Sequence, residues 1–159
     1  MNILLIDDES AVTDAIKDVL KNFTPNKTYG RNLKIDVAND FYRARTFLNN
    51  QNPPYDLIVS DLLLPRRGAA IPNTYQGNSL TGWFFLCHHI LENGGTYHDN
   101  YQNTTIVLFS AYERVWEKYV ADTQQESFKN RVSLVSKGLS YNNVGNYEAL
   151  MDKIKTLFA

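Results

Sequence analysis

Five short apolar runs alternate with five segments of helical periodicity, and this alternation limits the fold more than any other feature of the chain. The runs predict strands at residues 2–6, 33–38, 57–60, 105–109 and 132–135. The helical segments are expected after Ser10, as a capping residue, and at residues 41–48, 83–91, 112–124 and 147–158. Strands that alternate with helices predict an α/β protein with one parallel sheet and helices on both faces.

The rules for such sheets restrict the strand order. Right-handed crossovers leave few topologies. The five-stranded doubly wound solution, called flavodoxin-like, has the order 2-1-3-4-5 and binds ligands at the carboxyl ends of strands 1 and 3. A chain of 159 residues fits this architecture as a single domain, residues 1–159.

Composition and charge argue against several classes of protein. The formal net charge is -1 and no basic block stands out, so nucleic-acid binding is not expected. No apolar run is long enough to cross a membrane, and residues 2–6 run into Asp7 and Asp8 instead of forming a signal peptide. A lone cysteine, Cys87, forms no internal disulfide, so we expect a cytoplasmic protein.

Polar residues stand where four of the predicted strands end. Asp7 and Asp8 follow the first strand and Asp61 the third, while Ser110 and Lys137 follow the fourth and fifth. Because strands 1 and 3 are neighbours in the expected order, the three carboxylates should converge. Two such charges about 4 Å apart repel by roughly 4 kcal/mol at an effective dielectric of about 20, and one lysine cannot neutralise three of them.

A divalent cation would relieve this repulsion. Mg²⁺ prefers carboxylate oxygens and commonly shares its coordination shell with phosphate oxygens. The cluster therefore predicts a Mg²⁺ site in which one carboxylate is free to attack phosphorus, as in aspartyl-phosphate chemistry. Lys137 would offset the charge of the phosphoryl group, and Ser110 would donate a hydrogen bond to it.

These residues, in their order along nearly the whole chain, resemble the receiver domain of bacterial two-component response regulators, of the chemotaxis-regulator type. The residues that carry the resemblance are Asp7, Asp8, Asp61, Pro65, Ser110, Ala111 and Lys137.

The resemblance implies a role for each residue of the site. Asp61 would accept a phosphoryl group from a sensor histidine kinase or a phosphotransfer protein. Asp8 would bind Mg²⁺ directly and Asp7 mainly through water, with Asp61 and the backbone carbonyl of Leu63 as further ligands. Ser110 would move toward the phosphoryl group, and Lys137 would pair with it. The added charge would switch the face made by the fourth helix, the fifth strand and the fifth helix.

The chain departs from the family's pattern beside the site. Gly138 follows Lys137 where the family usually has Pro, and Leu134 stands where the family often has a rotating aromatic switch residue. Leu63 and Tyr112 occupy the flanking positions that influence hydrolysis of the phosphoryl group.

Residues 66–81 form an insertion after the third strand, where the family reaches a glycine, here Gly82, much sooner. Long loops are often functional, so one hypothesis is a lid or docking loop with Arg66 or Arg67 near the phosphoryl group. The alternative is a tolerated insertion without a role.

Trp116, in the fourth predicted helix, also has two interpretations. It belongs either to the core or to a partner-binding patch on the signalling face.

The function expected from these observations is a stand-alone receiver whose phosphorylation on Asp61 changes protein contacts with a downstream target or causes homodimerisation. No residues after the last helix are left for an output domain. We expect no enzyme activity beyond the protein's own phosphoryl transfer and dephosphorylation. The alternatives are a degenerate receiver that works as a phosphorylation-independent interaction module and an Asp-nucleophile phosphatase. Leu63 disfavours the phosphatase, because it replaces the general acid that such enzymes carry two residues after the nucleophile.

Overall fold

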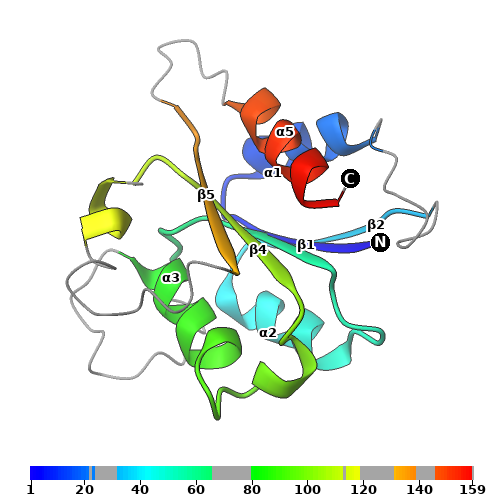
Figure 1. The fold of residues 1–159 in the computed structure, drawn as a ribbon, viewed down its shortest axis with the longest axis vertical. Coiled ribbons are helices and arrows are strands. Elements are labelled where there is room, and N and C mark those ends of the chain that lie inside the picture. The colour runs from blue at the N-terminus through cyan, green and yellow to red at the C-terminus, as the bar shows by residue number, and fades with distance from the viewer. Residues whose placement is uncertain are drawn as a thin grey trace.

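Five parallel strands form one sheet in the order β2-β1-β3-β4-β5, as predicted (Figure 1). The computed structural model describes residues 1–21, 23, 32–65, 80–112, 114–118, 131–138 and 146–158. The strands are β1 (Asn2–Ile6), β2 (Lys34–Ala38), β3 (Leu57–Ser60), β4 (Thr105–Ser110) and β5 (Val132–Ser136). The protein is therefore of the doubly wound, flavodoxin-like class.

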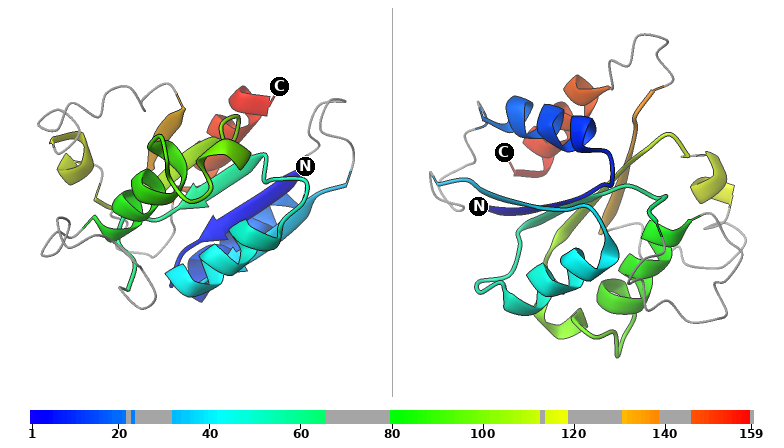
Figure 2. Two further views of the ribbon diagram at one scale, coloured as in Figure 1. Left: turned by 90° about the horizontal axis from the view of Figure 1, so that it is seen from below. Right: turned by 180° about the vertical axis from the view of Figure 1, so that it is seen from behind.

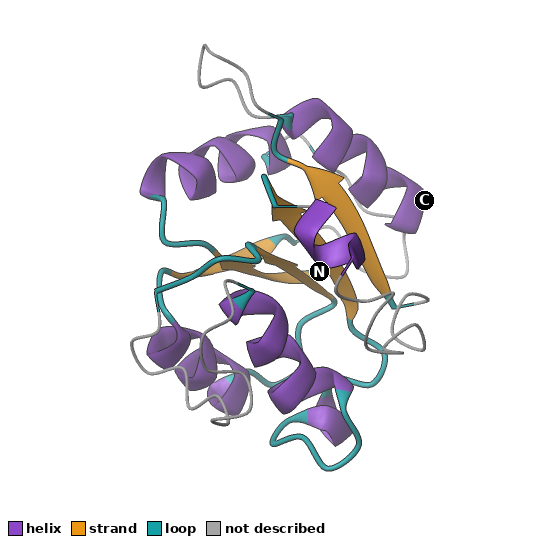
Figure 3. Cartoon of the chain, turned by 90° about the vertical axis from the view of Figure 1, so that its left-hand side faces the viewer, coloured by secondary structure: helices purple, strands orange, loops and turns teal. Residues whose placement is uncertain are grey.

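Helices cover both faces of the sheet (Figure 1, Figure 3). Helices α1 (Ser10–Leu20) and α5 (Tyr147–Phe158) lie together on one face, and α2 (Phe41–Asn50) and α3 (Thr81–Leu86) lie on the other (Figure 2). Residues 114–118 are also helical, and the predicted continuation to residue 124 lies outside the described residues. In the described parts of the chain, no helix combines the length and the apolar character that crossing a bilayer requires.

The side chains of β1 explain why its sequence is apolar at almost every position. Ile3 and Leu5 point into the core beneath α1 and α5, whereas Leu4 and Ile6 point into the core beneath α2 and α3. Each of these four side chains is at most 1% exposed. Burial of a side chain of this size contributes roughly 1.5–3 kcal/mol, so both faces of the central strand stabilise the fold.

The expected start of the first helix is wrong in detail. Ser10 is the first helical residue and not its cap; Glu9 occupies the N-cap position, and its side chain makes no capping hydrogen bond. The turn before the helix is closed instead by Asp7, whose Oδ1 accepts the Glu9 amide at 2.9 Å. Asp and Ser side chains can both hydrogen-bond to nearby backbone amides. Here Asp7, which directly follows β1, makes such a bond and sets the turn that leads into α1.

The third helix starts near Thr81, as expected for the helical segment 83–91. Thr81 is its first residue, and after Leu86 the chain continues as one π-helical stretch, Cys87–Leu91. Trp83, Phe84 and Phe85 are all buried, so α3 contributes three aromatic side chains to the core.

Candidate functional site

The register of the sheet brings the ends of four strands to one edge. Ile6 pairs with Ser60, so Asp7 and Asp61 follow neighbouring strand ends. The Asp61 amide donates to the Ile6 carbonyl at 2.9 Å and extends this pairing by one residue. On the other side, the Lys137 amide donates to the Ser110 carbonyl at 3.0 Å.

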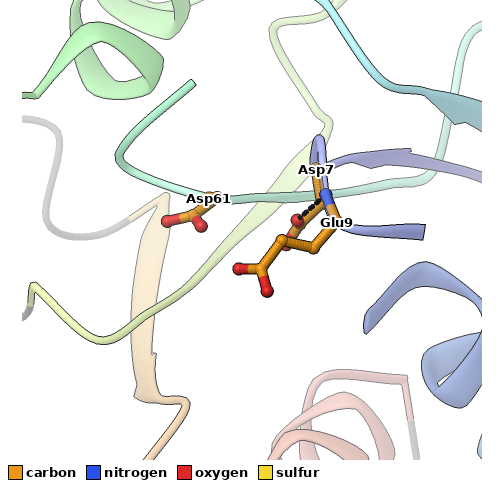
Figure 4. Close-up of side chains that lie close together, drawn as sticks. All are labelled: Asp7, Glu9 and Asp61. Atoms are coloured by element: carbon orange, nitrogen blue, oxygen red, sulfur yellow. Dashed lines mark hydrogen bonds between the residues drawn. The ribbon is translucent and has the colours of Figure 1, made fainter. Parts of the chain in front are cut away.

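Three carboxylates meet at this edge. Oxygens of Asp7, Glu9 and Asp61 all lie within 4.8 Å of one another. Figure 4 shows Asp7 and Glu9 on the turn after β1, joined by the hydrogen bond from the Glu9 amide, with Asp61 beside them after β3. Asp7 and Asp61 are buried, and Glu9 is exposed. All three ligands are oxygens, the donor type that hard divalent cations select.

Lys137 supplies the cation that partly balances these carboxylates. Its Nζ lies 2.6 Å from Asp61 Oδ2, 2.8 Å from Asp7 Oδ2 and 3.7 Å from Glu9 Oε1. Lys137 itself is only 12% exposed at its side chain. Because one ammonium faces three carboxylates, the group keeps an excess of negative charge.

Burial and the neighbouring charges shift the pKa values of Asp7 and Lys137. Burial raises the pKa of the Asp7 carboxyl from 3.8 to about 6, although Lys137 opposes the shift. Burial alone would lower the pKa of the Lys137 ammonium, but the carboxylates of Asp61 and Asp7 outweigh that effect and raise it. The two shifts therefore have different causes: burial disfavours the charged form of Asp7, whereas the nearby carboxylates favour the charged form of Lys137.

The Asp61 carboxylate is held by donors on both of its oxygens. Ser110 Oγ donates to Oδ1 at 2.6 Å, and the Leu63 amide donates to the same oxygen at 3.2 Å. Lys137 donates to Oδ2 at 2.6 Å. Ser110 is fully buried, and its Oγ also accepts the Tyr112 amide at 3.3 Å. Asp61, Ser110 and Lys137 are thus in direct contact, as the sequence predicted.

A cavity of about 460 Å³ opens beside Asp61. Its other lining residues are Asp8, Glu9, Leu63, Leu64, Pro65 and Tyr112. Asp61 forms part of the wall while being only 7% exposed, so a reactant would reach its carboxylate through this opening.

The structure groups a different second carboxylate with Asp7 than the sequence suggested. Asp8 is exposed and lines the cavity, but it lies outside the three-carboxylate group, in which Glu9 takes part. Glu9 was not among the predicted ligands, although it belongs to the run of three acidic residues after β1. Leu63, expected to offer its carbonyl to the metal, lines the same cavity and is 36% exposed.

The three expected switch or partner residues lie in different environments. Tyr112 is 42% exposed at the cavity, and Leu134 is partly buried against the core that includes α2 and α3. Trp116 is only 5% exposed and meets Trp83 edge to face, with ring centroids 5.4 Å apart. This burial favours the core interpretation of Trp116 over a partner patch.

The predicted lid residues Arg66 and Arg67 lie outside the described residues, as does the insertion up to residue 79. Its last two residues, Leu80 and Thr81, are described and are buried. At the position after Lys137, Gly138 has φ +73°, a conformation that proline cannot adopt.

No family model and no curated protein sequence matches the chain. Solved structures do match it. The Mn(2+)-bound form of response regulator Rcp1 shares 18% identity, with a TM-score of 0.62 over 99% of this chain and 94% of the other. The receiver domain from hybrid histidine kinase CckA shares 17% identity, with a TM-score of 0.57 over 100% of both chains.

A third match comes from the complex of the P1 domain of CheA3 with CheY6 from R. sphaeroides. It shares 17% identity, with a TM-score of 0.53 over 98% of this chain and 96% of the other. The chain therefore has the fold of response regulator receiver domains.

Proposed function

We propose that this protein is a phosphoacceptor receiver that takes a phosphoryl group on Asp61 in a metal-dependent reaction. One observation carries the proposal: the Asp61 carboxylate borders an open cavity and is held between Ser110 Oγ and Lys137 Nζ, each 2.6 Å away. This arrangement combines a nucleophile with two donors that already lie where the charge of a phosphoryl group would develop.

The transfer would be a displacement at phosphorus. An oxygen of Asp61 forms the new bond to phosphorus, while the bond from phosphorus to the donor's histidine nitrogen breaks and its electron pair returns to the imidazole. Ser110 and Lys137 then exchange their bonds to the carboxylate for bonds to the phosphoryl oxygens, which keeps both donors satisfied. The proposal includes no other enzyme activity than this transfer and the later hydrolysis of the acyl phosphate.

The residues at the site fit a Mg²⁺ ion. Asp7, Glu9 and Asp61 offer three hard oxygen ligands close together, and Lys137 leaves part of their charge uncompensated. When bound, the cation would offset the negative charge of the carboxylates and of the incoming phosphoryl group. The family resemblance implies Asp8 and the backbone carbonyl of Leu63 as ligands, and both residues line the same cavity. That a similar structure is Mn(2+)-bound supports a divalent cation here.

The partners proposed are a histidine kinase or a phosphotransfer protein as donor and a protein as target. The similarity to a receiver of a hybrid histidine kinase and to a complex with the P1 domain of CheA3 supports this class of donor. Three points stay predictions from the sequence: action without an output domain of its own, dimerisation through the face made by the fourth helix, the fifth strand and the fifth helix, and a cytoplasmic location.

A direct test is the mass of the intact protein after incubation with Mg²⁺ and a small acyl phosphate. We expect one added phosphoryl group in the wild type, and none in Asp61→Asn or with a chelator. Asp56→Asn is a matched control, because Asp56 lies at the opposite end of β3 and its Oδ2 accepts the Asn2 amide at 2.7 Å. This variant should be modified like the wild type.

The other outcomes would contradict the proposal in different ways. If the wild type gains no phosphoryl group, the degenerate interaction module becomes the better interpretation. Rapid consumption of the donor without a trapped adduct would instead favour a phosphatase.

A further inference from the structure

Thr81 forms a buried hydrogen-bonded bracket with the chain just after Asp61. Its Oγ1 accepts the Leu64 amide at 2.9 Å and donates to the Leu64 carbonyl at 2.7 Å. Thr81 is 4% exposed and Leu64 is 3% exposed, so water has little access to the groups that form these two hydrogen bonds. One hydroxyl thus satisfies both backbone groups of a residue 17 positions away in the sequence.

The next residue, Gly82, extends this bracket to the phosphoacceptor itself. Its amide donates to the Leu62 carbonyl at 2.8 Å. A Cβ at Gly82 would collide with the backbone carbonyl oxygen of Asp61, so only glycine allows this approach. The first turn of α3 therefore touches the backbone of residues 61, 62 and 64, the segment that carries the nucleophile.

Regular secondary structure does not hold this segment in place. Residues 61–65 follow the end of β3 without regular structure. Residues 66–79 then separate Pro65 from Leu80, so the chain does not turn directly into α3. The bracket joins the two ends of that separation, and it lies next to Leu63, whose amide donates to Asp61 Oδ1.

We propose that Thr81 is a positioning residue for phosphoryl transfer: its hydroxyl fixes the 61–64 segment so that Asp61 and the Leu63 backbone are preset for the cation and the phosphoryl group. The inference rests on the proposed function and adds a residue from the far side of the insertion to its machinery. Groups that orient metal ligands through hydrogen bonds behave in this way, and their loss typically weakens metal binding about 10- to 100-fold.

The test compares four proteins: the wild type, Thr81→Val, Thr81→Ser and Thr104→Val. Valine removes both hydrogen bonds at nearly constant volume, and serine keeps the hydroxyl. Thr104 is the matched control, because it is also 4% exposed and its Oγ1 donates to the Tyr55 carbonyl at 2.7 Å, beyond the opposite ends of β3 and β4. For each protein, Mn²⁺ affinity is measured by calorimetry, and the rate of Asp61 phosphorylation is followed by intact mass.

We expect Thr81→Val to bind Mn²⁺ about tenfold more weakly or worse and to be phosphorylated more slowly. Thr81→Ser should restore both properties, and Thr104→Val should change neither, although it loses a buried hydrogen bond. Unchanged Mn²⁺ affinity in Thr81→Val would overturn the proposal. So would an equal loss in Thr104→Val, which would indicate general destabilisation, or a failure of serine to restore binding.

Two further results keep the test decisive. If Thr81→Val does not fold, amide hydrogen exchange in the wild type replaces it: a Leu64 amide that exchanges as fast as an exposed one rules out the bracket. If the wild type accepts no phosphoryl group, the proposed function fails, while the Mn²⁺ affinities of the four proteins still decide the role of Thr81.

Discussion

The replacement Asp7→Asn should stabilise the protein in the absence of a divalent cation. Asp7 is 4% exposed, and burial raises its pKa from 3.8 to about 6. At pH 8 the folded protein must hold this carboxyl in its charged form, which its environment disfavours. A shift of about two pKa units corresponds to about 3 kcal/mol. Asparagine removes the charge and keeps an oxygen for the Glu9 amide, so we expect a gain of about 1.5–3 kcal/mol.

The pH dependence gives this prediction a sign that can be checked. Because the folded pKa of Asp7 is raised, its contribution to stability is complete below about pH 4 and is lost as the pH rises through about 6. The advantage of Asp7→Asn should therefore be large at pH 8 and should shrink as the pH falls to 5. Stability is measured by urea unfolding in a chelator, with tryptophan fluorescence as the signal.

Asp14→Asn is the control for this experiment. Asp14 is exposed on α1 and pairs with Lys17, so its replacement should change stability by less than about 0.5 kcal/mol. An Asp7→Asn protein less stable than the wild type at pH 8 would refute the reasoning. A gain of equal size at pH 5 and pH 8 would also refute it, since a gain independent of pH cannot come from the carboxyl's ionisation.

Three other perturbations have defined outcomes. Mg²⁺ should raise the urea midpoint of the wild type and should raise that of Asp7→Asn less, because one ligand is lost; equal effects on both would place the ion elsewhere. Gly82→Ala should cost about 1–3 kcal/mol and slow phosphorylation, since the methyl group displaces the Asp61 carbonyl; unchanged rates measured by intact mass would contradict this contact. Trp116→Ala should cost about 3–5 kcal/mol in the same urea assay because it leaves a cavity against Trp83, whereas a neutral result would restore the surface interpretation.

The strands that are buried on both faces were the most predictable part of the fold. The bounds of β1 and β3 were predicted correctly because almost every side chain in them is apolar. Such a short apolar run between polar residues fits a strand buried on both faces. The start of α1 was missed because a serine at residue 10 looks like a cap in any context. Only the structure shows that the N-cap lies one residue earlier, at Glu9, and that Asp7 closes the turn before it.

Some contacts of the site could be predicted from the sequence, and others could not. Asp61, Ser110 and Lys137 stand at strand ends, and strand ends are set by the sheet, so their contact followed from the expected strand order. The backbone conformation of the turn after β1 decides whether the carboxylate of Asp8 or that of Glu9 lies beside Asp7. The pattern of apolar and polar residues does not predict that conformation. The packing of Trp116 on Trp83 depends on two helices far apart in the sequence, so it stayed undecided until the structure placed them.

The contacts of Asp61 with Ser110 and Lys137 join residues 49 and 76 positions apart in the sequence. Asp61 follows β3, Ser110 ends β4 and Lys137 follows β5, so both contacts require these three strands in their final register. A chain with one strand slipped by a residue would turn the side chains of that strand to the opposite face. The proposed phosphoryl transfer therefore depends on the assembled sheet, because a molecule in which these strands are not paired lacks the contacts that hold the Asp61 carboxylate.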